Sequence, residues 1–125
     1  MDITKLKNNK YIAGDFRQGN EAHRGWFVGD FFEQGHPAKT EKIEMMYTEH
    51  EPGHKCKPHY HQHKVELIIM LEGKARYNIN GSEVMLESGH YLFVDANNIV
   101  EAEFLEPSKI LAAHAPSLPS DKVVM

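Results

Sequence analysis

Two histidines and a glutamate stand close together in the middle of the chain: His59, His61 and Glu66. Successive side chains of a β-strand point to opposite faces, so we expect His59 and His61 to leave the same face. Glu66 belongs to the next expected strand and can approach both histidines as a third ligand. Two imidazoles and one carboxylate form the ligand set of open sites that bind Fe(II), Mn(II) or Ni(II). The spacing therefore predicts that these three side chains hold one divalent metal ion.

Glycines frame this group on both sides. Five residues separate Gly53 from His59, and six separate Glu66 from Gly73. With these glycines, the segment resembles the first sequence signature of the cupin superfamily at every fixed position. Residues 65–71 are strongly apolar and lead to a glycine, which is typical of a buried strand that enters a turn. The resemblance implies the jelly-roll barrel of the cupins, a double-stranded β-helix, with Fe, Mn, Ni or Zn bound inside it.

The second cupin signature is degenerate in this chain. Counted from Gly89, Asp95 stands where the family has proline and Asn97 where it has glycine. Asparagine tolerates the left-handed conformation that glycine supplies, so this second exchange is conservative. Val100 stands where the family has the histidine that is usually the fourth metal ligand. Valine cannot bind a metal, and the fourth ligand is therefore in question.

Three interpretations of the fourth ligand remain open. The site has no fourth protein ligand, or Glu101 takes the position through a one-residue slip, or His114 reaches it across the barrel. The apolar alternation of Val100, Ala102 and Phe104 disfavours the slip, because it assigns Glu101 to the opposite face. Under the resemblance, Glu101, Glu103 and His114 are also the candidates for the group that transfers protons in catalysis.

Four further residues receive a predicted position. His50 alternates with apolar neighbours on the strand before the histidine motif, and Tyr77 and Phe93 alternate on later strands. We expect these three side chains to line the substrate pocket. Cys56 is three residues from His59, an odd offset that predicts the opposite face of an extended segment. Cys56 is therefore not expected to contact the metal.

Short alternating runs separated by glycine, proline, asparagine or charged turns extend along the chain, and helical periodicity is weak. This pattern predicts an all-β fold of about eight antiparallel strands in two packed sheets. Asn80 and Gly81 are predicted to form the positive-φ turn of a hairpin. The expected strands cover residues 25–32, 41–51, 65–71, 74–79, 82–87, 90–96, 99–106 and 108–115, with a loop at 33–40.

Length and composition limit the classes of function. A chain of 125 residues predicts one domain, residues 1–125, with a polar lead-in at 1–24 and a tail at 116–125 whose prolines break strand pairing. The single cysteine excludes an internal disulfide and fits a reducing cytosol. The net charge of −4 without a basic stripe argues against a nucleic-acid partner. Without a signal peptide or a long apolar run, we expect a cytoplasmic protein with no membrane partner.

Two classes of function agree with these observations. The resemblance implies a small metal-dependent enzyme that acts on a sugar, an organic acid or another small oxygenated molecule, with a role in carbohydrate metabolism. The alternative is a non-catalytic ligand-binding or sensor barrel that has lost metal-dependent chemistry, which the exchange to Val100 favours. A homodimer is also expected, from the resemblance and from two aromatic clusters that exceed the needs of one small core: residues 26–28 and 31–32.

Overall fold

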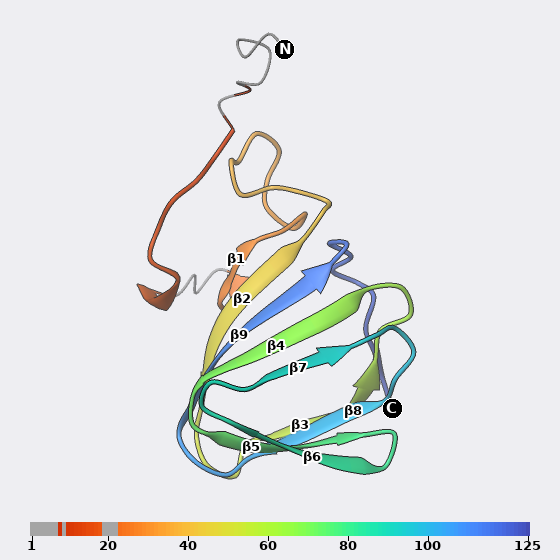
Figure 1. Ribbon diagram of the computed structural model, residues 1–125. Helices are drawn as coiled ribbons and strands as arrows, with labels where there is room; N and C mark the ends of the chain where they lie inside the picture. The colour runs from red at the N-terminus through yellow and green to blue at the C-terminus, as the bar shows by residue number, and fades with distance from the viewer. Residues whose placement is uncertain (1–7, 9, 19–22) are drawn as a thin grey trace, which may run out of the picture.

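The computed structural model describes residues 8, 10–18 and 23–125. Parts of the predicted polar lead-in, residues 1–7, 9 and 19–22, lie outside the described residues. Two five-stranded antiparallel sheets face each other as two layers (Figure 1). Within the described ranges no helix is long and apolar enough to span a membrane. The prediction of an all-β fold is confirmed.

Consecutive strands mostly alternate between the two sheets, which is the connectivity of a jelly roll. Sheet A contains, in spatial order, β1 (Trp26–Val28), β2 (Glu44–His50), β9 (Ser108–Ala115), β4 (Val65–Glu72) and β7 (Tyr91–Val94). Sheet B contains β10 (Val123–Val124), β3 (Lys55–Tyr60), β8 (Val100–Phe104), β5 (Lys74–Ile79) and β6 (Ser82–Glu87).

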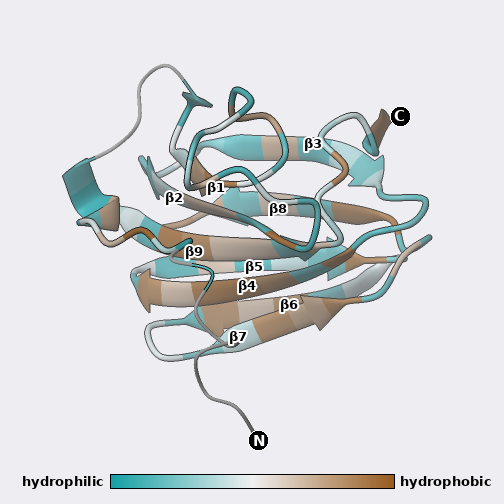
Figure 2. Ribbon diagram, turned by 90° about the horizontal axis from the view of Figure 1, so that it is seen from above, coloured by the Kyte–Doolittle hydropathy of each residue, from teal (hydrophilic) through white to brown (hydrophobic). Residues whose placement is uncertain are grey.

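The hydrophobic core lies between the two sheets. Every second side chain of a strand points inward, so β4 buries Ile68 and Met70, and β8 buries Val100, Ala102 and Phe104. Figure 2 shows the hydrophobic stretches on β4 and β6. Burial of such side chains stabilises the fold by roughly 1.5–3 kcal/mol each. The packed core fixes the register of the strands that carry the polar residues at one end of the barrel.

Two asparagines adopt the backbone conformations that the sequence predicts. Asn80 has a φ of 53° and Gly81 a φ of 93°, which together form the turn between β5 and β6. Asn97 has a φ of 65°, and its backbone N–H donates to the carbonyl oxygen of His61. The asparagine therefore replaces the glycine of the second signature without loss of the turn, and it ties this turn to the histidine segment.

The first predicted strand is too long. Only Trp26–Val28 is a strand, and a turn follows in which the Phe32 N–H donates to the Gly29 carbonyl. A side chain at Gly29 would meet the ring of Phe31 at 2.2 Å, so this ring folds back over the glycine. The turn brings Phe31 against Trp26 and Phe32 instead of extending the sheet.

The C-terminal tail is not free of strand pairing, contrary to the prediction. Val123 and Val124 form β10, which pairs with the end of β3. The two prolines of the tail precede this strand and do not interrupt it. Because β3 would otherwise be the edge of sheet B, the tail covers backbone groups that need partners.

Candidate metal centre

The structure brings His59, His61 and Glu66 together at one end of the barrel, where β3 ends and β4 begins. One ligand atom from each side chain lies within 4.8 Å of those of the other two. The rings of His59 and His61 are 5.5 Å apart and nearly perpendicular. His61 and Glu66 are buried, and His59 is half-buried. The arrangement offers three ligand atoms to one small cation.

A β-bulge in β3 directs His59 into the barrel. Cys56 pairs with Ala102 on β8, but His59, three residues later, pairs with Val100, only two residues earlier. One extra residue of β3 is therefore accommodated between these pairs. Since Ala102 and Val100 both face the core, Cys56 and His59 point to the same side. The predicted outward orientation of Cys56 is wrong, because strict alternation does not hold across a bulge.

Backbone carbonyls fix the protonation of both histidines. The Nδ1–H of His61 donates to the carbonyl oxygen of Asp121 at 2.6 Å, and the Nδ1–H of His59 donates to that of Lys57 at 2.8 Å. A carbonyl oxygen only accepts, so Nδ1 carries a proton in both rings, and in the neutral ring Nε2 carries the lone pair. Burial lowers the pKa of His61 and so favours this neutral form.

The Nε2 atom of His61 has no hydrogen-bond partner among the described residues, although it is buried. An unpaired buried acceptor is costly and usually marks a site for an ion or water. Metal-binding histidines typically donate the other ring N–H to a carbonyl or carboxylate, as both do here. The donor set and the unpaired Nε2 fit a divalent metal ion.

His114 lies beside this group and contacts Glu66. Its Nε2–H donates to Oε2 of Glu66 at 2.6 Å, and its Nδ1–H donates to Oε1 of Glu44 at 3.1 Å. Burial alone would lower the pKa of His114, but hydrogen bonds to the two carboxylates raise it. The ring is thus protonated between two anions. His114 orients Glu66 and is not one of the three candidate ligands. Val100, at the position of the usual fourth ligand, pairs with His59.

Glu44, Lys64 and Ser117 complete the surroundings of His114. The sequence analysis did not predict any of the three as part of the site. Glu44 is almost fully buried and accepts hydrogen bonds from Lys64 and from the Ser117 hydroxyl. Lys64 is buried as well. Glu44 shares its strand face with Met46 and Thr48, so its inward position follows from alternation. Nothing in the sequence indicates that Lys64, beside an exposed histidine, is buried.

Three predicted residues lie away from the centre. Glu101 is exposed on the outer face of β8, where alternation places it, so the slip does not occur. Glu103 shares this outer face and pairs with Lys55, so neither of these candidates for proton transfer is in the site. His50 is about 20 Å along β2 from Glu44. Its ring stacks on Phe104 with centroids 4.0 Å apart, and burial lowers its pKa to about 4. His50 closes the opposite end of the core and does not line a pocket near the histidines.

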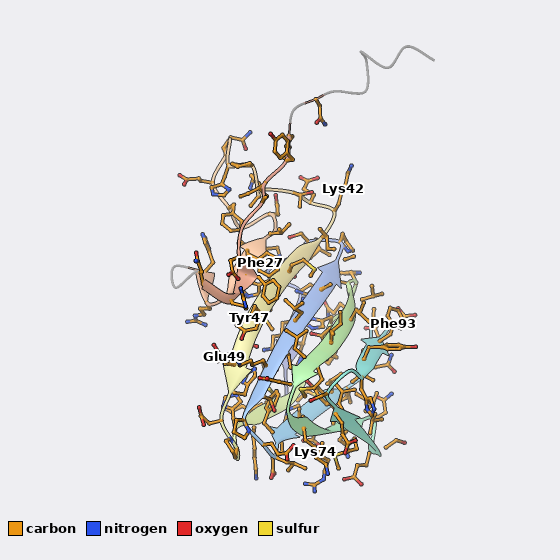
Figure 3. The ribbon with its side chains drawn as sticks, turned by 60° about the vertical axis from the view of Figure 1, so that its left-hand side comes forward. Phe27, Lys42, Tyr47, Glu49, Lys74 and Phe93 are labelled. Carbon is orange, nitrogen blue, oxygen red and sulfur yellow. The ribbon has the colours of Figure 1, made fainter. Side chains whose placement is uncertain are left out.

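Phe93 and Tyr77, the other two predicted pocket residues, lie in different surroundings. Phe93 is 55% exposed and points away from the sheets (Figure 3), because Leu92 and Val94 take the inward positions of β7. Tyr77 is buried in the interior. Burial raises the pKa of Tyr77 above its usual range, and the charge of Glu66 raises it further. Of the three predicted pocket residues, Tyr77 is therefore the one that shares the interior with the candidate metal ligands.

Comparison with solved structures identifies the fold. An uncharacterized conserved protein with a double-stranded β-helix domain from Klebsiella pneumoniae is 20% identical, with a TM-score of 0.62 over 68% of this chain and 76% of that chain. KdgF from Halomonas sp. is 18% identical, with a TM-score of 0.62 over 80% of this chain and 94% of that chain. Pac13 from Streptomyces, a nucleoside dehydratase, is 13% identical, with a TM-score of 0.63 over 69% of this chain and 70% of that chain.

None of the curated proteins matches the sequence. The likeness to solved structures confirms the predicted double-stranded β-helix and shows the fold alone. The family described as Cupin domain matches residues 46–110, more than half of the chain. This range contains the three candidate ligands and the framing glycines. The chain belongs to the cupin family.

Proposed function

We propose that this protein is a metal-dependent cupin in which His59, His61 and Glu66 bind one divalent ion. The observation that carries the proposal is the convergence of their ligand atoms within 4.8 Å, together with the unpaired Nε2 of His61. Fe, Mn, Ni and Zn all accept this ligand set. The substrate is a small oxygenated molecule, such as a sugar or an organic acid, bound inside the barrel.

The residues around the triad have distinct roles in this proposal. A bound divalent ion supplies Lewis-acid chemistry, which polarises an oxygen of the substrate. His114 holds the carboxylate of Glu66 in place and is the remaining candidate for proton transfer. Tyr77 and Val100 form part of the interior wall. Pac13, a nucleoside dehydratase of the same fold, supports the choice of a small oxygenated substrate. A place in carbohydrate metabolism is part of the same proposal.

The test is metal analysis of the protein purified without chelator. We expect close to one divalent ion per chain, and we expect His59→Ala to abolish it. His63→Ala is the matched control, because His63 is two residues from His61 but exposed, and it should bind like the wild type. Equal loss of metal in both variants would contradict the assignment of the ligands.

The alternative is a binding or sensor barrel without turnover, and Val100 is the observation that favours it. A valine at the position of the usual fourth ligand lowers the expected metal affinity. If the protein takes up none of the four metals, His59 and His61 act as hydrogen-bonding groups for an organic ligand. Metal uptake therefore discriminates between the two functions.

We also propose a cytoplasmic homodimer. The edge strand β7 carries Tyr91, 71% exposed, and Phe93, 55% exposed, on the outer face of sheet A. Exposed aromatic side chains next to an unpaired strand edge favour association with a second copy of the chain. The single, half-buried Cys56 fits a reducing compartment.

A further inference from the structure

The last residues of the chain lie along the strand that carries the candidate ligands. Val124 pairs with His59 and Val123 with Tyr60, and the Met125 N–H donates to the Pro58 carbonyl. In Figure 1 the C-terminus lies next to β3 and β8. The core between the sheets is built from strands β4 to β9, so these final residues add little to it. Their contacts concentrate on the segment around the histidines.

Asp121 lies just before β10 and binds the loop between His61 and Glu66. One carboxylate oxygen accepts from the backbone N–H of residue 62 at 2.9 Å, and the other accepts from those of residues 63 and 64 at 2.7 and 2.9 Å. Asp121 is only 8% exposed. Burial alone would raise its pKa, but the three N–H groups lower it. The carboxylate fixes three successive residues of the loop.

The same residue also fixes the ring of His61. Its backbone carbonyl accepts the Nδ1–H of His61 at 2.6 Å, which leaves the unpaired Nε2 as the atom available to a metal. Without this acceptor, the ring is free to rotate or to carry its proton on Nε2. One residue therefore sets the tautomer of a candidate ligand and the course of the chain to the next ligand.

We propose that residues 121–125 are a C-terminal brace, with Asp121 as its positioning residue, that preorganises His61 and Glu66 for metal binding. This inference rests on the proposed function as far as the metal is concerned, whereas the tautomer of His61 is a property of the metal-free protein. Partners of this kind typically change metal affinity by about 10–100-fold. The tail, not only the barrel, is part of the site.

The test compares the full chain with a chain that ends at Ser120 and with Asp121→Ala. Co(II) titration followed by absorption measures affinity, and circular dichroism monitors the fold. We expect about a 10–100-fold loss of Co(II) affinity in both variants, and a smaller loss in Asp121→Asn. Asp15→Ala is the control, because Asp15 also accepts a backbone N–H, from Arg17, but lies in the N-terminal segment. It should bind Co(II) like the wild type.

A second readout does not depend on metal. Nitrogen-15 NMR of the metal-free wild type should show His61 protonated at Nδ1, and the chain ending at Ser120 should show this preference lost. Unchanged affinity together with an unchanged tautomer would overturn the inference. If the shortened chain does not fold, the two point variants decide. If the wild type binds no metal, the proposed function fails, and the tautomer alone decides whether the brace exists.

Discussion

The buried charges around Glu66 balance one another. Glu44 and Glu66 carry negative charge, and Lys64 and His114 carry positive charge, all in positions that are less than 10% exposed. Such a cluster is tolerated in a core only when each charge has a partner. Glu44 contacts both cations and is therefore the residue on which the balance depends.

Replacement of Glu44 tests this balance. Glu44→Gln leaves the buried ammonium of Lys64 without a counter-ion, so we expect the free energy of unfolding to fall by about 3–5 kcal/mol in urea titrations. Glu87 pairs with Lys74 at the surface, where an ion pair contributes less than about 1 kcal/mol, so Glu87→Gln is the control. Equal stability of the two variants would show that the cluster is not a structural unit.

At the scale of elements, β3 shows which structural features the sequence predicts and which it does not. Alternation predicts the common face of His59 and His61, and the apolar run after them predicts β4. The bulge that turns Cys56 inward leaves no signature in the sequence, because it depends on the pairing of β3 with β8. Glu101 shows the opposite case, since the alternation of its neighbours is sufficient to place it outside.

Long-range pairing explains the difference at the C-terminal tail. The prolines of the tail predict an unpaired end, but β10 forms because β3 offers it a free edge. The difference at residues 25–32 is local instead: the apolar pattern resembles a strand, but the chain turns at Gly29, over which the ring of Phe31 packs. The apolar pattern predicts most of the extended residues, but neither this turn nor the distant segment that pairs with a strand.

The framing Gly73 is predicted to be required by the turn between β4 and β5. Its φ is 110°, and a Cβ there would lie 2.3 Å from the Ser108 hydroxyl and 2.6 Å from the Pro107 carbonyl. Gly81 has a φ of 93° but open space around it. We expect Gly81→Ala to cost roughly 1–2 kcal/mol of unfolding free energy. Gly73→Ala should cost more than twice as much, and equal losses would show that the turn relaxes around the methyl group.

At the scale of the molecule, the aromatic residues divide into packed and exposed sets. Trp26 packs edge-on against His114 and Phe31, so the first aromatic cluster covers the polar end of the barrel. Phe27 and Tyr47 lie close together outside sheet A, with Phe16 packed against both (Figure 3). On the two sheets, the strongly exposed aromatic side chains are Tyr91 and Phe93 of β7. The surface proposed for the homodimer is therefore not the one that the sequence suggests.

Light scattering tests the proposed homodimer. The full chain should give a mass near twice 14.3 kDa at micromolar concentration. Phe93→Glu introduces a charge into the proposed contact and should give a monomer with an unchanged fold. Tyr11→Glu is the matched control, because Tyr11 is 82% exposed in the N-terminal segment, and it should remain a dimer. A wild-type chain that stays monomeric across dilution would contradict the proposal.

The most direct test of the account is a crystal structure of the protein as purified, with anomalous diffraction collected at the Fe, Mn, Ni and Zn absorption edges. We expect one anomalous peak at the end of the barrel, in contact with Nε2 of His59, Nε2 of His61 and a carboxylate oxygen of Glu66. The Nδ1–H of His61 should still donate to the Asp121 carbonyl. A peak elsewhere, or an empty site after soaking with each metal, would contradict the central claim that these three residues form a metal centre.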